Sequence, residues 1–175
     1  MPTSSQLKIT AVAGAIVLLT ATPALALGGL IRTGGPLSDF APASSGPFDE
    51  ARARVQIVES AKGSHAVLTV KGIDTSVDGD TFGAHLHDGP CIAGDGAAAG
   101  PHYNSYVHGQ TPVSGISDRT EIWLDFTVED GAGTSTASVP FVPESGNRSV
   151  VVHAAPTNPQ TGGAGPRLAC LTVSW

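Results

Sequence analysis

The stretch "ARVQIVESAKGSHAVLTVKGI", residues 53–73, decides the fold class of this 175-residue chain. Residues 53–60 and 65–73 are rich in β-branched and apolar side chains, which favour strands. Between them, "AKGS" (61–64) offers the small residues and the glycine that a short turn needs. The stretch therefore predicts an antiparallel hairpin.

Similar runs follow along the chain, separated by turn signals. Asp-Gly pairs ending at Gly79 and Gly131 predict two further turns. Beyond the N-terminal segment, no window has an apolar period of 3.6 residues, and the sequence has no internal repeat. Further β-prone runs lie at 120–128, 136–142, 148–154 and 167–175. Seven or eight short strands in one domain over residues 51–175 predict an all-β antiparallel sandwich or flattened barrel.

The first 50 residues differ in composition from the rest. Lys8 and the apolar run 9–19 precede "TPALA" (22–26), a pattern typical of a secretory signal peptide, residues 1–26, cleaved after Ala26. The run is too short and interrupted for a stable membrane span, although an uncleaved anchor is the alternative. Residues 27–50, rich in Gly, Pro and Ser, predict a linker. The protein is expected outside the cytoplasm, in the periplasm, cell wall or extracellular space.

Charge and cysteine content narrow the possible functions. The net charge is −6 and no basic run occurs, which argues against nucleic acid as a partner. Cys91 and Cys170 are the only cysteines, and in an exported protein such a pair most simply forms a disulfide. A reactive or metal-binding thiol is the alternative.

Three of the six histidines lie within "TFGAHLHDGPCIAGDGAAAGPHYN", residues 81–104. His85 and His87 are two positions apart on a predicted strand, so both imidazoles leave the same face. His102 follows a Gly-Pro pair that ends regular structure, and His153 ends the run "SVVVH". Four imidazoles without a thiolate suit a tetragonal Cu(II) site better than structural zinc.

Four pieces of the sequence, taken together and in this order, resemble the copper/zinc superoxide dismutase family. They are "FGAHLHDGPC" (82–91), "AGPHYN" (99–104), "GNRSVVVHAAP" (146–156) and "GGAGPRLACLTV" (162–173). The resemblance covers about residues 53–175 and implies a Greek-key, immunoglobulin-like β-barrel of about eight strands. It also implies that the copper ligands are His85, His87, His102 and His153.

The resemblance assigns further roles. His102 falls where the family has the imidazolate that bridges copper and zinc, and it is the expected proton shuttle. Arg167 matches the arginine that guides superoxide to copper, and Cys91 and Cys170 match the family disulfide. The implied activity is secreted superoxide dismutation to O2 and hydrogen peroxide by Cu(II)/Cu(I) cycling. The alternative is a non-catalytic copper-binding module of the cell envelope. Family members differ in oligomeric state, so monomer and homodimer both stay open.

The zinc site of the family is incomplete in this chain. Its loop needs two more histidines and an aspartate, but it offers only His108 at a different spacing, with Arg119 near the last histidine position. Thr157 stands where the family has the aspartate that links the two metals. The sequence therefore favours a copper-only member without zinc, with His108 as a loop histidine. His65, which has no family counterpart, is expected to face solvent.

The loss of zinc leaves His102 without the partner of its second ring nitrogen. A ligating imidazole normally donates its other N–H to a nearby acceptor. Glu121 and Asp125 flank Trp123 in "TEIWLDF" (120–126), and either carboxylate is a candidate acceptor. The alternative is that both are surface carboxylates.

Overall fold

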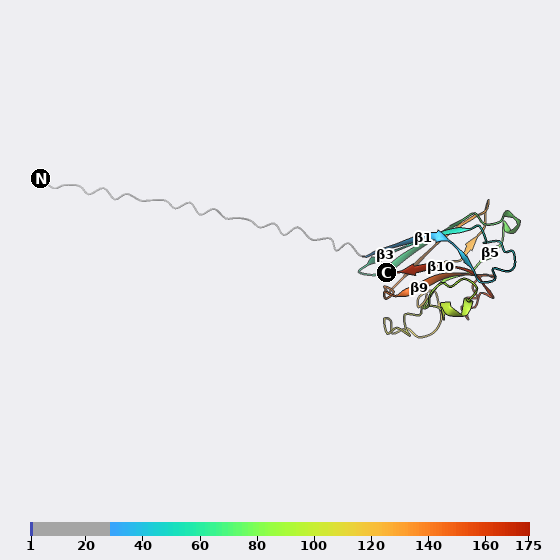
Figure 1. Ribbon diagram of the computed structural model, residues 1–175. Helices are drawn as coiled ribbons and strands as arrows, with labels where there is room; N and C mark the ends of the chain where they lie inside the picture. The colour runs from blue at the N-terminus through green and yellow to red at the C-terminus, as the bar shows by residue number, and fades with distance from the viewer. Residues whose placement is uncertain (2–28) are drawn as a thin grey trace.

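Two four-stranded antiparallel sheets pack against each other in the computed structural model, which describes Met1 and residues 29–175 (Figure 1). The first sheet has the order β1 (Leu30–Pro36), β3 (Arg52–Ser60), β4 (Gly63–Lys71), β8 (Ala132–Val139). The second has the order β2 (Ser38–Asp39), β10 (Arg167–Ser174), β9 (Asn147–His153), β6 (Ala84–His87). A small third sheet pairs β5 (Thr81–Phe82) with β7 (Phe126–Thr127). The predicted all-β fold is confirmed.

Only two helices, both short and 3-10 in type, occur among the described residues. They are η1 (Thr75–Val77) and η2 (Gly96–Ala99), and η2 begins where the Asp95 carboxylate accepts from two backbone amides. Neither has the length and apolar character that a membrane span requires. The predicted signal peptide lies, apart from Met1, outside the described residues.

The hairpin predicted from residues 53–73 is present as β3 and β4, which pair antiparallel from Arg52↔Lys71 to Ser60↔Gly63. Alternation along the strands sends one set of side chains into the core between the two sheets. On these two strands the buried apolar residues are Ala53, Val55, Ile57, Ala66, Leu68 and Val70. Most side chains on the other face are polar or charged, with Val58 and Val67 among them.

The prediction of a linker over residues 27–50 is wrong for residues 30–39, which form β1 and β2. β1 pairs with β3 along its whole length, and Ile31 and Leu37 are buried. Glycine and proline did not prevent a strand here, because β1 lies at a sheet edge, where a missing N–H is tolerated. Phe48 also packs into the core, with its ring centroid 5.0 Å from that of Phe82.

The strand predicted over residues 120–128 is shorter in the structure, where only Phe126–Thr127 forms a strand. The preceding residues are linked to β6 by single hydrogen bonds, from Leu86 N to Ile122 O and from Leu124 N to Ala84 O. Ile122 and Leu124 are fully buried. This segment therefore lies along β6 without forming a continuous ladder.

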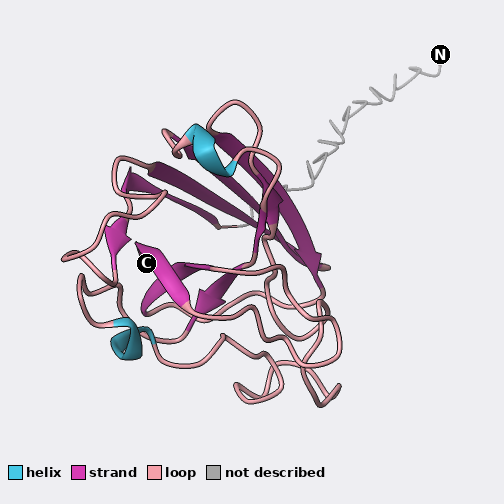
Figure 2. Cartoon of the chain, turned by 90° about the vertical axis from the view of Figure 1, so that its right-hand side faces the viewer, coloured by secondary structure: helices cyan, strands magenta, loops and turns pink. Residues whose placement is uncertain are grey.

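Alternation on β6 and β9 directs one set of side chains into the core and the other set outward. Leu86 and Val152 belong to the core, whereas the histidines of β6 and His153 of β9 lie on the opposite face. Long loops gather on one side of the sheets (Figure 2). The histidines are consequently covered by loops rather than by a second sheet.

Candidate metal centre

The four histidines singled out in the sequence come together at one point. His85, His87, His102 and His153 each offer a ring nitrogen, and these nitrogens all lie within 4.8 Å of one another. Two of the four come from β6 and one from the end of β9. Such a set of imidazole nitrogens has the composition of a metal site.

His102 reaches this point because its backbone runs antiparallel to the end of β6. His102 forms a bridge with His87, and the neighbouring amide of Tyr103 donates to Leu86 O at 2.8 Å. Asp88 N donates to Pro101 O at 3.0 Å on the other side of the bridge. The loop therefore delivers His102 from a different direction than the strand histidines.

Hydrogen bonds to backbone carbonyls show which ring nitrogen of His87 and His153 carries the proton and which is free to bind a metal. Their Nδ1 atoms lie 3.0 Å from Gly100 O and 3.2 Å from Gly165 O. A carbonyl only accepts, so each Nδ1 carries the proton and each Nε2 has a free lone pair. The two Nε2 atoms face each other at 3.3 Å, an arrangement that a cation between them would stabilise.

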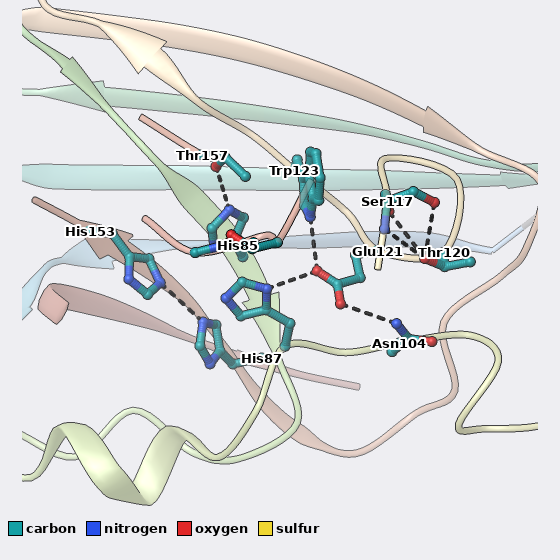
Figure 3. A network of polar contacts seen from close by, with 12 residues as sticks. His85, His87, Asn104, Ser117, Thr120, Glu121, Trp123, His153 and Thr157 are labelled. Carbon is teal, nitrogen blue, oxygen red and sulfur yellow. Dashed lines mark hydrogen bonds and ion pairs between the residues drawn. The ribbon is translucent and has the colours of Figure 1, made fainter. Parts of the chain in front are cut away.

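His85 presents the other nitrogen of its ring. Its Nε2 lies 2.6 Å from Thr157 Oγ1 (Figure 3). The Thr157 hydroxyl in turn donates to Asp125 Oδ1 at 2.6 Å. The Thr157 hydroxyl thus accepts from His85 Nε2–H, which leaves Nδ1 without a proton. This Nδ1 is buried and is the one buried side-chain polar atom without a hydrogen-bond partner among the described residues. An orphaned lone pair at this place fits a metal ligand.

Glu121 is the carboxylate that meets His102. His102 Nδ1–H donates to Glu121 Oε2 at 2.8 Å, and Trp123 Nε1–H donates to the same oxygen at 2.9 Å. Asn104 Nδ2–H donates to Glu121 Oε1 at 3.1 Å (Figure 3). Asp125, the other candidate, binds Thr157 instead. The fourth nitrogen that faces the cluster without a proton is therefore His102 Nε2.

Three of the four histidines are held in the neutral form that metal binding requires. Burial, followed by repulsion from the neighbouring imidazoles, lowers the pKa of His85 to about 2. Burial also lowers the pKa of His87 to about 3 and that of His153 to about 4. Burial alone would raise the pKa of Glu121, but the hydrogen bonds that it accepts outweigh burial and hold its pKa below the usual value. Glu121 is thus an ionised acceptor.

Arg167 lies next to the cluster and is fixed by the loop that follows β6. Its guanidinium donates to Gly96 O and, at 2.5 Å, to Gly100 O, the carbonyl that also accepts from His87. Gly100 has a φ of 67°, which an L side chain rarely adopts. A single glycine carbonyl therefore connects a ligand candidate to the arginine.

The disulfide predicted between Cys91 and Cys170 is present, and its cysteines are 79 positions apart along the chain. It joins the loop after β6 to β10, the strand on which Arg167 also lies. A pocket of about 520 Å³ opens over the centre, and both His102 and Arg167 line it. The centre can consequently be reached by a small anion from solvent.

The remaining two histidines lie apart from the cluster. His65 is exposed on β4 and bonds Ser138 at 2.9 Å, in agreement with its expected solvent position. His108 stacks on Tyr103 with ring centroids 4.2 Å apart and lies between the Asp88 and Glu144 carboxylates at 2.9 and 3.3 Å. His108 therefore ties down the loop that follows His102.

Two contributors were not identified as such from the sequence. Asn104 belongs to the "AGPHYN" piece, but nothing in the sequence connects its amide with Glu121. In the sequence Thr157 stands only for a missing aspartate, whereas in the structure its hydroxyl joins His85 to Asp125. Both links depend on loop conformations that bring distant residues into contact.

A family model described as copper/zinc superoxide dismutase matches residues 51–173. No match to the chain was found among curated proteins.

Proposed function

We propose that this chain, which belongs to the copper/zinc superoxide dismutase family, is a secreted superoxide dismutase that uses copper alone. The observation that carries the proposal is the convergence of four unprotonated imidazole nitrogens beside Arg167. His85 would bind through Nδ1, and His87, His102 and His153 through Nε2. Four neutral imidazoles without a thiolate are a ligand set that suits Cu(II).

The reaction converts two superoxide anions and two protons into O2 and hydrogen peroxide. Bound copper would supply the one-electron exchange, taking an electron from one superoxide and giving it to the next. Arg167 attracts and orients the anion, because its guanidinium is fixed at the pocket by two carbonyls. In a chain with a net charge of −6, this local positive charge matters more than any long-range field.

His102 is the residue suited to carry a proton to the reduced substrate. Its Nδ1–H stays with Glu121, so Nε2 is the atom that can take up and release a proton. The ionised Glu121 stabilises the imidazolium that this would create. Glu121 thus holds the ring in the orientation that a second metal provides in zinc-binding members of the family.

The alternative is a copper-binding module of the cell envelope without catalytic activity. The position of Arg167 favours the enzyme, because a storage site has no need for a fixed cation at the mouth of its pocket. The predicted signal peptide supports export in either case.

Replacing Arg167 tests the enzymatic proposal. In copper-loaded protein, Arg167→Ala should lower the superoxide consumption rate by about tenfold or more, since electrostatic steering raises on-rates by 10–1000-fold. Arg119→Ala, which removes an exposed arginine elsewhere, should change the rate less than twofold. Equal losses in both variants, or copper bound without consumption in the wild type, would favour the non-catalytic module.

A further inference from the structure

The outer face of the first sheet carries an unusual share of the positive charge. The chain has nine basic residues, of which Lys8 lies outside the described part. Four of the other eight are exposed on this one face, on β1, β3 and β4: Arg32, Arg52, Arg54 and Lys71. Strands β6 and β9, which carry three of the four metal-centre histidines, belong to the other sheet, so the mechanism does not use these residues.

The strand register makes the four cations neighbours. Arg52 is directly opposite Lys71, and Arg54 follows two residues later on the same face. Arg32 lies opposite Gln56, the next outward position on β3, and donates to its Oε1 at 2.9 Å. From Arg52 to Gln56 the strand rises about 13 Å. The charges therefore form one continuous row across three strands.

This arrangement is unfavourable without a negatively charged partner. Like charges directly opposite each other destabilise a sheet, as Arg52 and Lys71 do here. None of the ion pairs among the described residues involves any of the four cations. The chain has fifteen acidic residues, so carboxylates were available for pairing. An external anion would relieve the repulsion.

A groove of about 680 Å³ lies between the cations. Gly34 on β1 has no side chain to fill it, and Gln56 and Thr69 add an amide and a hydroxyl to its lining. No aromatic and no large apolar side chain lines the groove. Single-stranded nucleic acid is bound by stacking on aromatic rings, and membrane surfaces by inserted apolar side chains. The lining of this groove offers neither feature.

We propose that this basic groove, formed by Arg32, Arg52, Arg54 and Lys71, binds a linear anionic polysaccharide. Arginine guanidinium groups match the geometry of carboxylate and sulfate groups, and the neutral polar side chains can bond sugar hydroxyls. Binding here would hold an exported protein on a charged carbohydrate matrix while the pocket on the other sheet stays open. The inference does not depend on dismutase activity.

Binding of the purified protein to two probes tests the proposal. Heparin presents sulfate groups and polygalacturonate presents carboxylates, so their relative affinities identify the preferred anion. Arg52→Gln/Arg54→Gln should weaken binding by about tenfold or more and lower the slope of log affinity against log salt by roughly one to two. Lys62→Gln/Arg119→Gln removes the same charge at exposed positions elsewhere and should change affinity less than twofold.

Three results would overturn the proposal. The first is no binding of the wild type to either polysaccharide at low ionic strength. The second is an equal loss of affinity in both double variants, which would indicate a non-specific charge effect. The third is tighter binding to a single-stranded DNA oligomer or to vesicles containing phosphatidylserine. Melting temperatures of both double variants check that the fold is intact, and superoxide consumption should be unchanged in both.

Discussion

Among single residues, Glu121 connects the metal centre with the chain around it. It is 3% exposed and accepts three hydrogen bonds, from His102, Trp123 and Asn104. His102 and Asn104 lie on the chain after the loop that follows β6, and Trp123 lies on the segment that runs along β6. One carboxylate therefore fixes the tautomer and orientation of a copper ligand candidate and joins it to its surroundings.

The variant Glu121→Gln should weaken copper binding by about 10–100-fold, as the loss of a ligand's partner commonly does. Glutamine keeps the size of the side chain but replaces one accepting oxygen with a donor, which conflicts with His102 or Asn104. Competition with a chelator of known affinity measures the effect. Glu129→Gln, at an exposed turn, is the matched control. Unchanged affinity and pH profile in Glu121→Gln would show that Glu121 has no such role.

At this scale the sequence predicted which histidines meet but not which carboxylate supports them. The H-x-H spacing on a strand places two imidazoles on one face, and the family resemblance supplied the other two. Glu121 and Asp125 are four residues apart, so both point to the same side of an extended segment. The choice between them depends on where His102 and Thr157 arrive from distant loops.

Among the structural elements, the loop from the end of β6 to Gly100, which includes η2, positions Arg167 as well as His87. The loop is fastened to β10 by the disulfide and by the carbonyls that accept from the guanidinium. The two residues of β10 that hold the loop, Arg167 and Cys170, are three positions apart. The same loop thus contributes to the stability of the fold, through the disulfide, and to the shape of the pocket, through Arg167.

The double variant Cys91→Ser/Cys170→Ser should lower the free energy of unfolding by about 2–5 kcal/mol, because a long loop of the unfolded chain is no longer closed. Chemical denaturation measures the difference. A reducing agent should shift the wild type toward the variant and leave the variant unchanged, which serves as the internal control. Equal stability of the two proteins would show that packing alone holds the loop.

Strands were predicted well where apolar and polar residues alternate clearly. They were missed where glycine and proline made a strand resemble a linker. Strands β3, β4, β9 and β10 lie within a few residues of the predicted runs. Residues 30–39 contain glycine and proline, which are typical of linkers, yet Ile31 pairs with Ile57 and completes the edge of a sheet. Whether residues 30–39 form an edge strand depends on a partner strand further along the chain. The composition of these residues alone does not reveal that partner.

For the molecule as a whole, the buried imidazoles make the metal-free protein sensitive to acid. His85, His87 and His153 have folded-state pKa values of about 2, 3 and 4, whereas an unfolded histidine has one near 6.5. Below that pH the unfolded chain binds protons that the folded chain does not. The contribution of these three histidines to the free energy of unfolding is therefore fully present above pH 6.5 and is lost as the pH falls toward 4.

Chelator-treated protein should accordingly melt at progressively lower temperature between pH 7 and pH 5, with up to about three protons taken up on unfolding. Calorimetry across this range gives the dependence. His65→Gln, which removes an exposed histidine outside the cluster, is the matched control. A melting temperature that is flat or rises as the pH falls would mean that the cluster is not buried in its neutral form.

Copper-only dismutation is the central claim, and metal loading tests it most directly. Metal-free protein is loaded with copper alone, its metal content is measured, and superoxide consumption is followed before and after zinc is added. We expect one copper per chain, full activity without zinc, and less than a twofold change on adding zinc. Stoichiometric copper without superoxide consumption, or activity that appears only with zinc, would contradict the claim.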